Sequence, residues 1–128
     1  MKTLKTTLLT LALGSLLVGS AVAQTASTST TSGAGPGVYD PGHPRVNEVN
    51  AREQNQQNRI ANGVKSGQLT PGEASRLEKK ENRIVKQEQR DMAKNNGHLT
   101  KAEQAKINRE QNKVSKDIYR DKHNAKTN

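Results

Sequence analysis

The segment Gly67–Glu73, which reads GQLTPGE, recurs thirty residues later as Gly97–Glu103, which reads GHLTKAE. In each copy the Thr hydroxyl can accept a hydrogen bond from the third amide of a helix, while the Glu at that position reaches back to the Thr amide. Thr70 with Glu73, and Thr100 with Glu103, therefore predict two helix starts. The glycine ahead of each copy suits a chain that leaves a preceding helix in a left-handed conformation.

The repeat divides the chain from residue 45 onward into three expected helices, at about 46–65, 71–95 and 101–121. The register continues beyond the motifs, since Leu77 corresponds to Ile107 and Ile84 to Val114. Most residues in these segments are good helix formers, and the apolar ones are sparse but helically spaced. The prediction is an all-α protein with two or three amphipathic helices, forming an antiparallel helical hairpin or a small open bundle.

The helices at 71–95 and 101–121 are expected to pair through their apolar stripes. Val46, Val49, Ile60 and Val64 on the first helix would complete the packing. Glu53 and Gln56 interrupt that stripe, so we expect the first helix to be held less firmly.

The composition predicts a thin hydrophobic core. Hydrophobic residues make up 30% of the chain, with no Phe, Trp or Cys and only Tyr39 and Tyr119 as aromatics. Globular domains usually contain about 45–50% apolar residues. No disulfide can compensate for the small core. We therefore expect marginal stability, an elongated shape, self-association or ordering on a partner.

The first 23 residues have the pattern of a cleavable export signal. Lys2 and Lys5 precede an apolar stretch that ends at Ala21-Val22-Ala23, a small-x-small cleavage pattern. The stretch is shorter than the about 20 residues that a membrane anchor needs. We therefore expect a signal peptide at 1–23 and a periplasmic or secreted protein. A disordered linker rich in Ser, Thr, Gly and Pro is expected at 24–44, a helical repeat domain at 45–122 and a flexible tail at 123–128.

One face of the helix at 71–95 is strongly basic. Seven cations fall within an arc of roughly 100°, in a chain whose formal net charge is +9. Such a face can attract an anionic client protein or an envelope polyanion, or it can simply keep a thin-cored protein soluble. Nucleic acid is not an expected partner, because the protein is exported and has no aromatics for stacking. The predicted binding residues are Arg76, Lys79, Lys80, Arg83, Lys86, Arg90 and Lys94.

The helix at 101–121 carries a second basic stripe. Acidic residues run beside it, each three positions before a base, which stabilises a helix by a few tenths of a kcal/mol per pair. The stripe consists of Lys106, Arg109, Lys113, Lys116 and Arg120.

Catalytic chemistry has little support in this sequence, and no cofactor is expected. His43, His98 and His123 are far apart in sequence and are interpreted as solvated residues of turns or the tail. Glu81 and Glu88 share one helix face, and we interpret them as a salt-bridged edge rather than a catalytic pair. We expect a protein that is not an enzyme.

Each repeated motif also matches the second half of an EF-hand loop, with Glu73 or Glu103 in the bidentate position. The first half fails, because Val64 and Lys94 stand where oxygen ligands belong. A degenerate EF-hand-like module with weak calcium binding through Glu73 and Glu103 is therefore an alternative function. A self-assembling structural protein is another.

The Leu-Thr-x-x-Glu pairs resemble the Leu-Thr-x-x-Gln repeats of small periplasmic stress proteins, the Spy-like chaperones. That resemblance rests on Leu69–Glu73 and Leu99–Glu103 and implies an all-helical, ATP-independent chaperone of dimeric form. The stretch from His43 to His123 also resembles a group of small exported bacterial proteins, a similarity that implies no activity. Together these observations predict a non-enzymatic, exported helical binding protein, chaperone-like or belonging to the envelope stress response.

Overall fold

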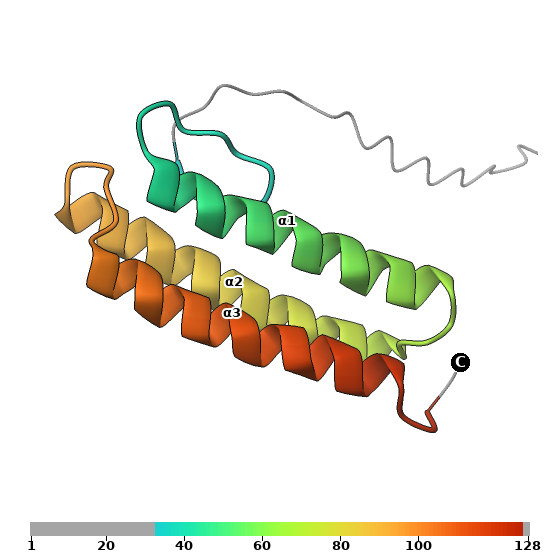
Figure 1. The fold of residues 1–128 in the computed structure, drawn as a ribbon. Coiled ribbons are helices and arrows are strands. Elements are labelled where there is room, and N and C mark those ends of the chain that lie inside the picture. The colour runs from blue at the N-terminus through green and yellow to red at the C-terminus, as the bar shows by residue number, and fades with distance from the viewer. Residues whose placement is uncertain (1–32, 127–128) are drawn as a thin grey trace, which may run out of the picture.

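The computed structural model describes residues 33–126, and these form a three-helix antiparallel bundle (Figure 1). The helices are α1 (Pro44–Lys65), α2 (Pro71–Lys94) and α3 (Lys101–Lys122). The predicted all-α small bundle is thus confirmed, with helix bounds within two residues of those expected. The predicted signal peptide and the first part of the predicted linker lie outside the described residues.

Both repeated motifs form complete capping boxes. Thr70 and Thr100 are extended, and their hydroxyls accept hydrogen bonds from the amides of Glu73 and Glu103, at 3.3 and 3.2 Å. In return each Glu carboxylate accepts from the amide and the hydroxyl of its Thr. Gly67 and Gly97 have φ of 71° and 86°, the left-handed conformation expected where the preceding helix ends.

Within residues 33–126 the core is a single cluster of twelve buried apolar residues, drawn from all three helices and the two loops. Val64, expected in this core, is 43% exposed. Its neighbour Gly63 faces the interior instead, against Leu69. The cluster contains Val46, Val49, Ile60, Leu69, Ala74, Leu77, Ile84, Met92, Leu99, Ile107, Val114 and Ile118.

Polar side chains join α1 to α3 along much of the length of α1. The Gln56 amide donates to the backbone oxygen of Gln111 at 2.6 Å, and the Gln111 amide donates to that of Val49 at 3.0 Å. The Arg59 guanidinium donates to the Ser115 hydroxyl at 2.7 Å. The buried Gln56, which we expected to weaken the docking of this helix, therefore links α1 to α3.

Residues 33–43, the second half of the expected disordered linker, fold back onto α1. The side-chain amide nitrogen of Asn50 donates to the backbone oxygens of Gly33 and Val38, both at 3.0 Å. Its side-chain oxygen accepts a hydrogen bond from the backbone amide of Gly35 at 2.8 Å. Asn47 makes the corresponding pair of bonds to the backbone of Asp40. This short segment is thus ordered by side chains of α1, and it belongs to the helical domain.

Replacing Gly63 with Ala should destabilise the bundle, although Ala favours a helix by about 1 kcal/mol over Gly. A Cβ at this position would lie 2.6 Å from Leu69 Cδ1 and 2.7 Å from its Cγ. Because Leu69 is fully buried, we expect overpacking that costs about 1–3 kcal/mol. Gly72→Ala is the matched control, since a Cβ there meets nothing within 4 Å. Urea unfolding followed by circular dichroism measures the free energy of unfolding of both variants. Equal stabilisation by the two substitutions would contradict this packing.

Candidate functional site

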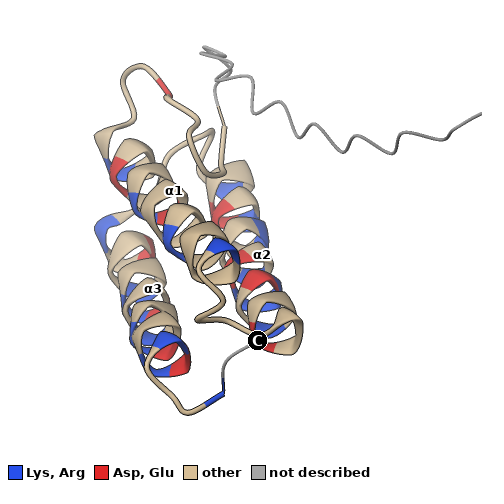
Figure 2. Cartoon of the chain, turned by 90° about the vertical axis from the view of Figure 1, so that its right-hand side faces the viewer, with Lys and Arg blue, Asp and Glu red and all other residues tan. Residues whose placement is uncertain are grey.

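The basic face of α2 consists of the seven predicted cations, and Figure 2 shows that Lys and Arg positions recur along this helix. Their ion pairs divide the seven into paired and unpaired groups. Arg76 donates to Asp121 on α3 at 2.7 Å, and Lys80 bridges to Asp117 on the same helix. Lys94 lies 3.7 Å from Asp91. Three of the seven cations therefore form ion pairs within the bundle.

The other four cations of this face are exposed and have no ion pair with any residue between 33 and 126. They are Lys79, Arg83, Lys86 and Arg90. Unpaired cations that share one helix face add their fields, so this part of α2 is a surface that attracts anions.

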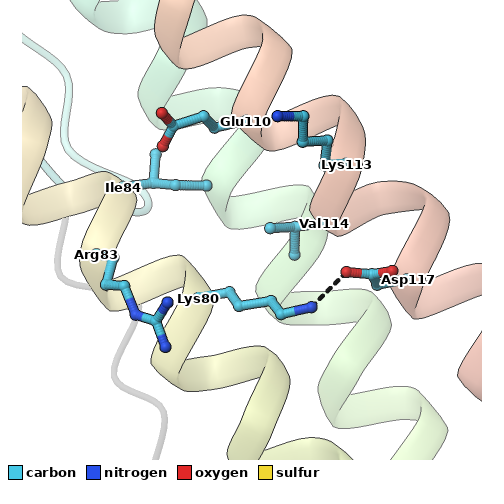
Figure 3. A pocket seen from close by; sticks show the side chains of 7 residues that line it. All are labelled: Lys80, Arg83, Ile84, Glu110, Lys113, Val114 and Asp117. Carbon is cyan, nitrogen blue, oxygen red and sulfur yellow. Dashed lines mark hydrogen bonds and ion pairs between the residues drawn. The ribbon is translucent and has the colours of Figure 1, made fainter.

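An open cleft of about 280 Å³ lies between α2 and α3, beside this face (Figure 3). The buried side chains of Ile84 and Val114 form its apolar floor. Charged side chains surround the floor, and Lys113 joins Arg83 and Lys80 as a cation from the facing helix. Lys113 belongs to the basic stripe expected on the third helix, although it was not among the predicted site residues. The remaining lining residues are Glu110 and Asp117.

Most acidic residues of α2 point away from this face into the protein. Glu81, Glu88 and Asp91 are buried, whereas Glu78 is exposed. The prediction that Glu81 and Glu88 form a salt-bridged edge is wrong, because neither is on the surface and their carboxylate oxygens have no hydrogen-bond partner among the described residues. The surface of α2 is consequently more basic than its sequence composition indicates.

The two capping carboxylates, which were the candidate calcium ligands, are committed to the helix starts. The backbone hydrogen bond from Thr70 holds the pKa of Glu73 below its usual value, assisted by Asn124, whose amide donates at 2.7 Å. The pKa of Glu103 is lowered in the same way by the backbone amide of Thr100. Through these contacts Glu73 and Glu103 stabilise the N-termini of α2 and α3.

The structure brings two of the three histidines together. His43 and His98 have ring centroids 4.2 Å apart, and His43 Nδ1 lies 2.9 Å from the buried Asp40 carboxylate. His123 lies at the other end of the bundle, stacked on Tyr119. His98 is exposed in the α2–α3 loop, as expected of a solvated turn residue, whereas His43 is only partly exposed because the segment before α1 folds over that loop. Within 33–126, no group of three or more His, Cys, Asp or Glu side chains is arranged to hold a metal ion.

None of the helices in the described part of the chain is both long and apolar enough to cross a membrane. Comparison with protein-family models, with curated proteins and with solved structures finds no match for this chain. The class that the fold defines is a small, basic three-helix bundle, and any inference about its function depends on its own surface and interior.

Proposed function

We propose that this protein is a non-enzymatic, exported helical binding protein that takes an anionic partner on the basic face of α2. The partner is an acidic client protein or an envelope polyanion, in the periplasm or outside the cell. The observation that carries the proposal is the separation of charge on α2. Lys79, Arg83, Lys86 and Arg90 are exposed and unpaired, while Glu81 and Glu88 are buried.

The cleft beside this face supports the same function. An anionic group could lie between Arg83 on α2 and Lys113 on α3, with its apolar stem against Ile84 and Val114. Exposed ion pairs contribute only about 0.2–1 kcal/mol each. Affinity would therefore come from several cations acting together, and it should fall as salt is added.

Reversing two charges on this face tests the proposal. The double variant Arg83→Glu, Lys86→Glu should bind heparin, used as the polyanion probe, about tenfold more weakly at low salt, a loss of roughly 1.4 kcal/mol. Titration calorimetry at several salt concentrations measures the effect, and the wild-type affinity should decline as salt rises.

The matched control is Lys65→Glu, Lys101→Glu, which changes the net charge equally at exposed positions outside the α2 face. Its affinity should change much less. If both double variants bound equally weakly, only the total charge would matter. If the α2 variant bound as well as the wild type, the proposed site would be rejected.

A further inference from the structure

Three glutamates lie in the interior of the bundle. Glu53 comes from α1 and is 1% exposed, while Glu81 and Glu88 come from α2 and are 1% and 0% exposed. All six carboxylate oxygens lack a hydrogen-bond partner among the described residues. Buried carboxylates are ordinarily paired, because an isolated charge in a protein interior is costly. Here the neutral, protonated form is the one that the interior accommodates.

The charges around the three carboxyl groups do little to stabilise their ionised forms. Burial raises the pKa of Glu53 to about 9, and repulsion from Glu88 and Glu81 adds to the shift. Burial raises the pKa of Glu81 to about 7, against the opposing charge of Arg59 on α1, whose guanidinium is bound to Ser115.

Burial also raises the pKa of Glu88 to about 8. The nearby Gly35 amide opposes this shift, but it donates its hydrogen bond to Asn50 Oδ1. From α3, the buried polar side chains are Gln111, a neutral amide, and Asp121, which is paired with Arg76. Arg59 and the Gly35 amide therefore compensate only in part for the burial of Glu81 and Glu88.

The three interfaces between helices are held differently. Ion pairs from Arg76 and Lys80 join α2 to α3, and Gln56, Arg59 and Gln111 form hydrogen bonds between α1 and α3. Between α1 and α2, as far as the structure describes them, no hydrogen bond or ion pair is present. The mutual repulsion of Glu53 with Glu81 and Glu88 acts across this interface.

We propose that Glu53, Glu81 and Glu88 form a pH-operated switch at the α1–α2 interface. When they are protonated the bundle is closed, and when they lose their protons α1 separates from α2 while α2 and α3 stay paired. Opening would expose apolar side chains of α1 and α2, such as Ile60 and Leu77, to a partner. This inference does not rest on the basic face, and it would stand if polyanion binding failed.

Distances between spin labels test the switch directly in the purified protein, which has no native cysteine. Labels at Asn55→Cys and Asn82→Cys, both exposed, span α1 and α2, whereas labels at Asn82→Cys and Lys116→Cys span α2 and α3. From about pH 5 to about pH 9, the first distance should lengthen and the second should stay constant, with helical circular dichroism retained.

The triple variant Glu53→Gln, Glu81→Gln, Glu88→Gln imitates the protonated state and should keep the α1–α2 distance short at both pH values. Glu53→Gln alone is the second variant, expected to raise the pH at which the distance changes. The proposal would be overturned if the α1–α2 distance did not change with pH, or if it still changed in the triple variant. It would also be overturned if both distances lengthened together and helicity was lost.

Discussion

Raising the pH from about 5 to about 9 should lower the free energy of unfolding steeply. In the folded protein the pKa values of Glu53, Glu81 and Glu88 are raised to about 9, 7 and 8. In the unfolded chain glutamate ionises near its ordinary pKa, about 4.3. Between these limits the folded state binds more protons than the unfolded state, so stability must fall as pH rises. Each extra bound proton contributes a slope of about 1.4 kcal/mol per pH unit.

The sign follows from the direction of the shifts. An acid whose folded pKa is raised gives its full stability below the unfolded pKa and loses it as the pH passes through the folded value. For this protein the loss begins above the ordinary glutamate pKa and continues to about pH 9, the folded pKa of Glu53. Because small domains have only about 5–15 kcal/mol of stability, three such groups can decide whether the closed bundle persists at neutral pH.

Urea unfolding followed by circular dichroism at a series of pH values measures this dependence. Glu53→Gln should reduce the slope between about pH 5 and pH 8 by about 1.4 kcal/mol per pH unit, because one of the bound protons is removed. Glu78→Gln, the exposed glutamate of the same helix as Glu81, should leave the slope unchanged. If stability rose over this range, or if both substitutions had an equal effect, the buried glutamates would not be holding protons in the folded state.

Below the ordinary glutamate pKa the trend should reverse. The pKa values of Glu73 and Glu103 are lowered by the amides that they cap, and that of Asp117 is lowered by its hydrogen bond with Lys80. These groups stabilise the fold in their charged form, and that stability is lost as pH falls through their folded pKa values. Stability should therefore pass through a maximum in mildly acidic solution.

Leu77→Ala should destabilise the bundle by about 2–5 kcal/mol. Leu77 is fully buried in the central cluster, and its truncation removes apolar contacts and leaves a cavity. Since the described part of the chain supplies only twelve apolar residues to this core, few neighbours are available to fill the space. Thermal and urea unfolding near about pH 5, where the interior carboxyl groups are protonated, would measure the loss with the least interference from their titration.

Val64→Ala is the informative control, because helical periodicity places Val64 in the core but the structure leaves it 43% exposed. Its truncation should change stability by less than about 0.5 kcal/mol, as for most surface substitutions. A large loss at Val64 together with a small loss at Leu77 would mean that α1 is rotated from the orientation described here.

The basic face could be predicted from sequence because it depends on one helix alone. Once α2 is helical, the angular positions of Arg83 and Lys86 follow from its periodicity. The pairing of Arg76 with Asp121 and the contribution of Lys113 to the cleft could not be predicted, since both depend on how α3 packs beside α2. Similarly, His43 and His98 meet only because the segment before α1 folds over the α2–α3 loop.

The amino-acid sequence by itself determined where α2 and α3 begin, because a capping box is a hydrogen-bonded unit of four consecutive residues. It also determined the all-helical class, through the spacing of a few apolar residues. Only the tertiary structure decided that Glu53, Glu81 and Glu88 are inside, because a charged residue on an apolar stripe can extend to solvent or be enclosed by a neighbouring helix. That choice depends on the rotation of α1 and α2 against each other, which no local pattern specifies.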